Sequence, residues 1–403
     1  MDILIVSQYL RNIENFEENN SRFVYLAKML KDNHSVEILT SNFSHGEKRH
    51  FKNIGNSGEI KVTAIDEPGY KKNVSFKRIY SHKVLAKNIA RYLENRKKPD
   101  VIYVAIPSLD VAEAVANYCK KNNVKFVIDI QDLWPEAFKM VLKIPVISDI
   151  LFKPMEIQAN SIYSMADEVV AVSKTYADRA LKVNKKCKEA KVVYLGTKKE
   201  TFDSYAKEET PALEKKTDEM WVGYIGSLSA SYDIKTVIDA LSEIKTDKDI
   251  RFVVMGSGPK KEEFEEYAKE KNINCIFTGA LPYPQMVATL KKCDIAVNPI
   301  VKGAAQSIIN KVGDFAMAGL PVVNTLECQE YRDLLCEYNA GIACECENSK
   351  EVSDAILKLI ESPELLKEMS KNSRRLGEER FDRENTYKLI YEVIANESLI
   401  SQP

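Results

Sequence analysis

The chain has 403 residues, of which 45% are hydrophobic and 29% charged, and its net charge is -1. This is the composition of a globular protein with about two domains, because a single core stops growing near 250–300 residues. The near-zero charge gives no reason to expect a nucleic-acid partner, and no stretch approaches the roughly 20 apolar residues that span a bilayer. The N-terminus lacks the basic start and long apolar core of a signal peptide, so a cytoplasmic protein is expected.

The first half alternates short runs rich in Val and Ile with longer amphipathic patterns. The predicted strands are Ile3–Ser7, Val36–Thr40, Val101–Ala105, Phe126–Ile130, Val169–Val172 and Val192–Leu195. The predicted helices are Arg22–Lys31, Ser81–Arg96 and Leu109–Asn122. Apolar strands that alternate with helices indicate an α/β domain with a doubly wound parallel sheet.

The pattern lapses after Phe202. Asp203–Glu219 is charged, lacks an apolar face and contains Pro211, so it is predicted to be a linker. The alternation then restarts with strands predicted at Trp221–Ile225, Phe252–Met255, Cys275–Thr278, Ile295–Pro299, Val322–Asn324 and Ile342–Cys344. The pattern therefore predicts four segments in the chain. They are a domain at 1–202, a linker at 203–219, a second domain at 220–375, and a helical segment at 376–403 that is expected to pack back on the first domain. Parallel sheets bind ligands beyond their carboxyl ends, so a cleft between the domains is expected.

The segment Gln306–Pro321 holds the most informative polar residues. It follows a predicted strand and reads as a helix with Ser307 as N-cap and Gly319 as its end. Lys311 and Asp314 then share one side with Ser307. A helix start with a lysine offers amide groups, the helix dipole and a cation to a phosphate, while an acid about 10 Å along the axis can hold sugar hydroxyls. The segment therefore predicts a nucleotide diphosphosugar site.

Several other segments carry a family resemblance. In the second half these are Val222–Leu228, Phe252–Pro259, Phe277–Leu281, and Asn310–Lys311 with Asp314–Val323. In the first half they are Asp129–Glu136, Ala166–Ser173 and Tyr194–Gly196. Over roughly residues 1–385 the chain resembles the retaining glycosyltransferases of the GT-B fold, especially family four, which includes capsule and lipopolysaccharide assembly enzymes. Asp129–Glu136 is similar to the D-L-W-P-E segment of transferases that build surface polysaccharides.

The resemblance implies two Rossmann-like domains in a GT-B architecture, the first binding the acceptor and the second the donor. It implies metal-independent transfer of a sugar, with retention, from a nucleoside diphosphate sugar (UDP-sugar above others) to a hydroxyl of a saccharide or lipid-linked saccharide. No cofactor and no metal are expected. The expected donor-binding residues are Gly226, Ser227, Gly256, Gly258, Ala280, Leu281, Gln306, Ser307, Ile308, Ile309, Lys311 and Asp314, and the catalytic candidates are Asp132, His45 and Lys311. A GT-B nucleotide-sugar epimerase and a binding subunit without catalysis are the alternatives.

The chain departs from the family pattern at two places. The family's paired glutamates are replaced by Gln306 and Asp314, so a charged role at 306 is not expected. Ser227 and Tyr232 stand where many relatives have Arg and Lys. Lys311 and the amides of residues 307–309 are therefore expected to meet the phosphate charge.

Other features keep two interpretations each. Asp132 and His45 follow predicted strands and so face the ligand edge; the other interpretations are a cap of the next segment for Asp132 and, as the commoner case, a free surface histidine for His45. Glycines 256 and 258 fit either a plain turn or close approach to a ligand. The basic stretch Lys71–Lys98 fits a solvated helix face or contact with anionic lipid headgroups. The apolar stretch Met140–Tyr163 fits a buried helix or an interfacial one.

The eight cysteines are predicted to be reduced, because a chain of this size needs no disulfides. Cys344 and Cys346 are the only close pair, and no histidine follows His82, so no zinc site is predicted.

Overall fold

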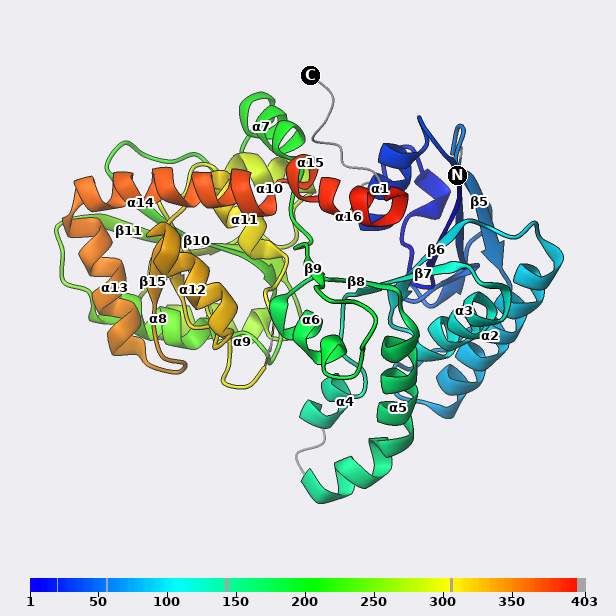
Figure 1. The fold of residues 1–403 in the computed structure, drawn as a ribbon. Helices are drawn as coiled ribbons and strands as arrows, with labels where there is room; N and C mark the ends of the chain where they lie inside the picture. Colours follow the sequence, from blue (N-terminus) through cyan, green and yellow to red (C-terminus); the bar gives the residue numbers. More distant parts are fainter. Residues whose placement is uncertain (20, 56, 142–144, 305–306, 397–403) are drawn as a thin grey trace. The chain divides into compact units, whose positions relative to one another are not determined.

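The computed structural model describes residues 1–19, 21–55, 57–141, 145–304 and 307–396. The chain divides into two compact units (Figure 1): unit 1 is Met1–Val193 with Tyr387–Pro403, and unit 2 is Tyr194–Thr386. Each unit has its own core of buried aliphatic and aromatic side chains. The edges predicted at 202 and 376 therefore differ from those of the compact units, at 193 and 386.

Unit 1 contains a seven-stranded sheet in the order β5-β2-β1-β6-β7-β8-β9, with all neighbouring strands parallel. Its strands are β1 Asp2–Ser7, β2 Ser35–Ser41, β5 Lys61–Ile65, β6 Val101–Ile106, β7 Lys125–Ile130, β8 Glu168–Ala171 and β9 Lys191–Val192. A small hairpin, β3 Phe43–Ser44 and β4 Arg49–His50, follows β2. The order reverses beside β1, which is the usual ligand position in such sheets.

The helices of unit 1 bury an apolar stripe on this sheet. They are α1 Arg22–Leu30, α2 Phe76–Asn95, α3 Leu109–Asn122, α4 Glu136–Val141, α5 Pro145–Met165 and α6 Lys174–Leu181, with a short 3₁₀ turn, η1, at Ile13–Asn15. Helix α3 has the predicted bounds. Helix α2 begins five residues before the predicted Ser81, because the Ser75 hydroxyl accepts a hydrogen bond from the Arg78 amide and caps an earlier turn.

The last described helix, α16 Lys388–Ala395, belongs to unit 1 and lies beside α1 (Figure 1). Tyr387 is fully buried, and its ring meets the Tyr25 ring edge-on at 5.5 Å. Its face also lies 4.9 Å from the guanidinium carbon of Arg22. Residues far apart in sequence thus complete one core.

Unit 2 contains a six-stranded parallel sheet in the order β12-β11-β10-β13-β14-β15. Its strands are β10 Glu219–Ser227, β11 Asp249–Ser257, β12 Cys275–Phe277, β13 Ile295–Asn298, β14 Val322–Asn324 and β15 Gly341–Ala343. All six predicted strands of the second half are confirmed; the four central ones, β11, β10, β13 and β14, are mostly buried apolar runs, while β12 and β15 at the two edges of the sheet are short and partly exposed.

The helices of unit 2 are α7 Lys199–Glu208, α8 Ile234–Glu243, α9 Lys261–Glu270, α10 Tyr283–Leu290, α11 Lys311–Ala318, α12 Gln329–Tyr338, α13 Ser349–Glu361 and α14 Pro363–Leu376. A π turn, η2 Gly377–Phe381, and α15 Arg383–Thr386 complete the unit.

The segment predicted as a linker is part of unit 2. Its first residues form the end of α7, and Phe202 is fully buried. Farther along, the Ala212 amide donates to Thr289 and the Lys215 ammonium pairs with Asp294 at 2.5 Å. The charged composition concealed this packing, because ion pairs and hydrogen bonds hold the segment instead of an apolar stripe, and the buried Phe202 lies just before it.

All eight cysteines are free, as predicted. No helix among the described residues is long and apolar enough to cross a membrane. Within the same residues, no group of three or more His, Cys, Asp or Glu is placed to hold a metal ion.

Candidate nucleotide-diphosphate site

Helix α11 follows strand β13 in unit 2 and begins at Lys311, three residues later than a helix with Ser307 as N-cap would begin. Asn310, not Ser307, precedes its first turn, and neither side chain caps it. Ile308 is buried and, with Ile309, lies outside the helix, because consecutive β-branched residues are poor helix formers. The prediction that the amides of 307–309 form the helix start is therefore wrong. The predicted end is confirmed, since Gly319 adopts a left-handed conformation with φ 71°.

Lys311 is enclosed by two tyrosines. Its Nζ lies 4.0 Å from the ring centroid of Tyr224 and 4.2 Å from that of Tyr232. Among the residues that the structure describes, this ammonium has no hydrogen-bond partner. Burial lowers the pKa of Lys311 well below its usual value. Cation–π contact compensates only part of the lost hydration, so the side chain is suited to an anion that restores its charge.

A cavity of about 360 Å³ lies next to Tyr232. It is lined by Ser227, Ser229, Ser231, Tyr232, Ile300, Ala304 and Ile309. Gly226, at the end of β10, brings the backbone close to the Lys311 side chain, because a Cβ there would lie 3.7 Å from Nζ. The cavity thus has three serines in its lining, and Tyr232 separates it from the Lys311 ammonium; serine hydroxyls and a lysine are donors suited to phosphate oxygens.

The sequence predicted part of this cavity. Ser227 and Ile309 line it and were expected donor contacts; Ser229, Ser231 and Tyr224 were missed. The alternating serines in Ser227–Ser231, directly after a buried strand, were the available signal. Gln306 lies outside the described residues.

Gly256, in β11, and Gly258, just after it, were predicted to approach a ligand closely, but packing within unit 2 also requires glycine at both positions. A Cβ on Gly256 would lie 1.9 Å from the carbonyl oxygen of Gly226, and one on Gly258 would lie 2.2 Å from that of Leu228. Packing of β11 against β10 and the loop that follows it thus requires both glycines. Their contact with a ligand stays a prediction, as does the role of Ala280 and Leu281, which lie in the loop after β12.

Asp314 lies one turn beyond Lys311. Its Oδ1 accepts hydrogen bonds from the Thr197 hydroxyl and the Tyr283 hydroxyl, each at 2.8 Å. Burial raises the pKa of this carboxyl group, while the two hydrogen bonds and Arg383 oppose the shift. The structure thus shows Asp314 joining α11 to the start of unit 2 and to α10, and ribose binding stays a prediction.

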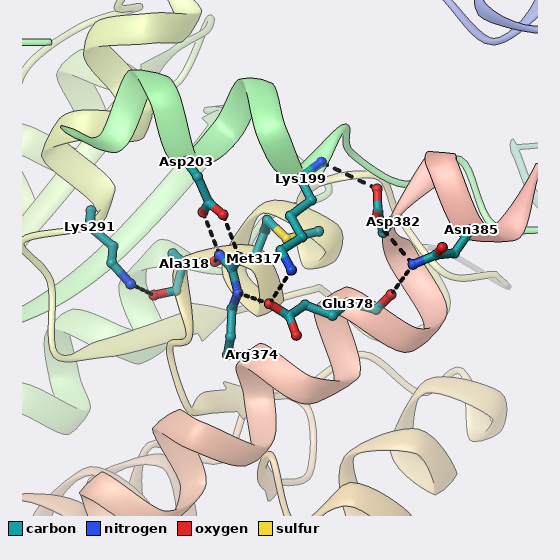
Figure 2. A network of polar contacts seen from close by, with 9 residues as sticks. All are labelled: Lys199, Asp203, Lys291, Met317, Ala318, Arg374, Glu378, Asp382 and Asn385. Carbon is teal, nitrogen blue, oxygen red and sulfur yellow. Dashed lines mark hydrogen bonds and ion pairs between the residues drawn. The ribbon is translucent and has the colours of Figure 1, made fainter. Parts of the chain in front are cut away.

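Polar contacts fix the carboxyl end of α11 (Figure 2). Arg374 on α14 donates from Nη1 to the carbonyl oxygen of Met317 at 2.7 Å and reaches both oxygens of Asp203 on α7 at 2.7 Å. Lys291 donates to the carbonyl oxygen of Ala318 at 2.8 Å. Two cations at this end also suit the helix dipole. They hold in place the helix that carries Lys311.

The other two catalytic candidates belong to unit 1. Asp132 accepts a hydrogen bond from the Leu133 amide at 2.9 Å, and burial raises the pKa of its carboxyl group. His45 meets the Tyr70 hydroxyl through Nδ1 at 2.5 Å. Burial, followed by the charges of nearby Lys and Arg residues, lowers the pKa of His45 to about 4. Both residues follow strands at the carboxyl edge of their sheet, and a cleft shared with Lys311 stays a prediction.

Two protein families match the chain. Residues 20–200 match the family described as Glycosyltransferase Family 4, and residues 206–376 match the one described as Glycosyl transferases group 1. A relative in Methanocaldococcus jannaschii, named an uncharacterized glycosyltransferase, is 26% identical over 241 residues, which are 58% of this chain and 60% of the relative. The chain therefore spans less than two thirds of that relative. WcaI of Escherichia coli, provisionally named a colanic acid biosynthesis glycosyl transferase, is 23% identical over 308 residues, 73% of this chain and 74% of WcaI.

Among solved structures, HepE of Anabaena in complex with UDP has a TM-score of 0.67 at 16% identity, covering 98% of this chain and all of HepE. The chain thus has the GT-B fold of two Rossmann-like domains, as predicted. Its sequence is similar to glycosyltransferases in both halves.

Proposed function

We propose that the chain is a glycosyltransferase that moves a sugar, with retention, from a nucleoside diphosphate sugar to a hydroxyl acceptor. UDP-sugar is the proposed donor. The observation that carries the proposal is the buried ammonium of Lys311, which has no hydrogen-bond partner among the described residues and lies 4.2 Å from the ring centroid of Tyr232, a residue that lines the cavity with three serines. The matches to glycosyltransferases along both halves, and a neighbour in fold solved with UDP, support the same reaction.

The chemistry requires negative charge to be stabilised where the donor bond breaks. When the bond between the anomeric carbon and the diphosphate oxygen lengthens, charge develops on the leaving diphosphate. Lys311, charged once an anion is present, and the hydroxyls of Ser227, Ser229 and Ser231 would meet that charge without a metal ion. The acceptor oxygen then bonds to the anomeric carbon on the face from which the diphosphate leaves, and the leaving phosphate takes the proton of the acceptor hydroxyl. The configuration is therefore retained.

The acceptor in this proposal is a saccharide, free or lipid-linked, in the assembly of a surface polysaccharide. The similarity to WcaI, provisionally named for colanic acid biosynthesis, supports this assignment. A lipid-linked acceptor would require contact with a membrane surface.

The start of helix α2 supports peripheral contact with an anionic membrane. Val74 is 86% exposed and Phe76 is 91% exposed, and Lys71 and Lys72 are exposed beside them. Apolar side chains with lysines at their edge bind a lipid surface through burial and charge. Sedimentation with vesicles tests this point: vesicles containing anionic lipid should carry the protein down and neutral vesicles should not, and Phe76→Ser should weaken the binding.

The decisive test of the transfer reaction is nucleotide release from a panel of UDP- and GDP-sugars with saccharide acceptors. The wild type should release nucleotide with one donor class. Lys311→Met should lower the rate by about 100–1,000-fold, since a group that stabilises transition-state charge contributes about 2.7–4 kcal/mol. Lys302→Met, an exposed lysine in the preceding loop, is the matched control.

Three outcomes would contradict the proposal. Equal rates of nucleotide release in Lys311→Met and the wild type would show that Lys311 does not stabilise the leaving diphosphate. Donor binding without any turnover would indicate a binding subunit, and interconversion of sugar epimers without transfer would indicate an epimerase.

A further inference from the structure

Unit 1 carries a cluster of aromatic rings and histidines at the carboxyl edge of its sheet. Tyr9 follows β1, His45 lies in the β3–β4 hairpin, Tyr70 follows β5, His82 lies on α2, and Trp134 follows β7. Neighbouring rings have centroid distances of 5.0 Å for Tyr9 and His45, 5.7 Å for Tyr70 with either histidine, and 6.2 Å for His82 and Trp134. Separate loops thus bring ring faces together at the edge where such sheets bind ligands.

Two cations lie over these rings. The guanidinium carbon of Arg78 is 5.0 Å from the ring centroid of Trp134 and 5.6 Å from that of Tyr70. The Lys48 ammonium is 4.9 Å from the Tyr70 centroid and 3.3 Å from Nδ1 of His45. Both side chains are only partly buried, so solutes can reach them.

The hydrogen bonds of these cations all go to neutral groups. Arg78 donates to the Asn73 carbonyl oxygen at 2.8 Å and to the Tyr9 hydroxyl at 3.1 Å, and Lys48 donates to the Asn73 side-chain oxygen at 2.6 Å. The Nε of Arg78 is buried and has no hydrogen-bond partner within the described part of the chain. A buried guanidinium donor without a partner costs free energy, so an additional acceptor is expected there.

Within the part of the chain that the structure describes, the two cations of the cluster form no ion pair. Among the described residues, neither Arg78 nor Lys48 has a carboxylate oxygen within 4.0 Å. The nearby carboxylate of Glu67 accepts instead from the Ser41 hydroxyl at 2.5 Å and the Ser81 hydroxyl at 2.8 Å. Exposed Arg11 adds a further positive charge, and the pKa of His45 is lowered by Lys48, Arg78 and Arg11 after burial. The cluster is therefore a region of positive potential.

We propose that this aromatic and cationic cluster binds the acid group of an acidic saccharide acceptor, with Arg78 and Lys48 contacting a phosphate or carboxylate oxyanion. The partly exposed rings of Tyr9 and His45 can contact the C–H surface of a sugar, while Tyr70, His82 and Trp134 are buried and support them from below. Arg78 Nε and the Lys48 ammonium supply charge-assisted hydrogen bonds to the acid. The inference rests on the proposed transferase function, because only a transferase has an acceptor. It narrows the proposed acceptor from any saccharide to an anionic one.

Trp134 provides a readout of binding, because the Arg78 guanidinium carbon lies 5.0 Å from its ring centroid and the chain's other tryptophan, Trp221, belongs to unit 2. The full chain without donor is titrated with glucose 1-phosphate, with glucuronate and with the neutral methyl glucoside, and its fluorescence is followed. Either acidic sugar should bind at least about tenfold more tightly than the neutral one, and the tighter of the two identifies the acid group. Equal binding of all three would overturn the proposal.

Two variants remove the cations separately, so that a folding defect in one does not end the test. Arg78→Gln and Lys48→Gln should each weaken binding of the acidic sugar by about 10–100-fold, which corresponds to the 1.5–3 kcal/mol of a hydrogen bond to a charged group. Lys87→Gln, an exposed lysine on the same helix, should bind as the wild type does. Unchanged binding in both cation variants would contradict the assignment.

Lys311→Met separates this inference from the donor site. The acidic sugar should still quench Trp134 in this variant, because Lys311 belongs to unit 2. Loss of the signal in Lys311→Met with retention in Arg78→Gln would place the anion in the donor site and overturn the inference. Absence of nucleotide release from every donor would instead reject the transferase proposal and leave the oxyanion site intact.

Discussion

The ammonium of Lys311 lies 4.0 Å from the ring centroid of Tyr224. A ring face attracts a cation by about 0.5–2 kcal/mol, which is less than the cost of removing an ammonium from water. Burial therefore lowers the pKa of Lys311, and a bound diphosphate would raise it again. Stability and ligand binding oppose each other at this residue.

The first prediction follows from that opposition. Replacing Lys311 with Met should raise the free energy of unfolding by about 1 kcal/mol or more, since a buried polar group without a partner is removed. The same change should weaken UDP binding by at least about tenfold. Urea denaturation and calorimetry measure the two effects, with Lys302→Met as the control. A variant that is less stable and binds UDP normally would show that Lys311 serves packing.

The second prediction concerns Asp314. Asp314→Ala should lower the free energy of unfolding by about 1–3 kcal/mol, because the hydroxyls of Thr197 and Tyr283 both lose their acceptor. Thr197→Val removes one of the two hydrogen bonds and should cost about 1 kcal/mol. A double-mutant cycle should then show coupling, since the two residues are in contact. Strictly additive losses would mean that the Thr197 hydrogen bond adds nothing to stability.

The third prediction concerns the buried ion pair of unit 1. Arg22 Nε donates to Asp129 Oδ2 at 2.7 Å, and both side chains are almost fully buried. Arg22→Met should lower the free energy of unfolding by about 3–5 kcal/mol, because Asp129 would remain buried without a cation. Adding Asp129→Leu should recover part of that loss. Thermal and urea unfolding provide the measurement, and a double variant less stable than either single one would contradict it.

The fourth prediction is a pH dependence. Burial, followed by the charges of Arg78 and His45, lowers the pKa of His82 to about 3, whereas an unfolded histidine titrates near 6.5. Between these values the unfolded chain binds one more proton, so the free energy of unfolding falls as the pH falls, by up to about 1.4 kcal/mol per unit. His82→Gln should show a shallower decline between pH 6.5 and 5 in urea titrations. Parallel curves for variant and wild type would contradict the shifted pKa.

The sequence predicted the two sheets well and the local geometry of the sites less well. Runs such as Val101–Ala105 identify buried parallel strands because hydrophobic burial depends on the residues themselves. The predicted start of α11 was wrong. Serine is a common helix-capping residue, but whether Ser307 caps a helix depends on how the buried Ile308 beside it packs. Arg78 and Trp134 lie 56 residues apart, and nothing in either neighbourhood indicates that one lies over the other.

The return of the chain to unit 1 has a practical consequence. Unit 2 is a continuous insertion, and its two ends lie together, since the Thr197 amide donates to the carbonyl oxygen of Phe381 at 2.8 Å. In unit 1, Val193 precedes the insertion and Tyr387 follows it, and Arg22 contacts both residues. It donates to the carbonyl oxygen of Val193 at 2.9 Å, and its guanidinium lies over the ring of Tyr387. Unit 2 can therefore be excised at 194–386, and a short loop can rejoin 193 to 387. Each half could then be produced as a separate protein, whereas a cut at 193 alone would leave unit 1 without its last helix.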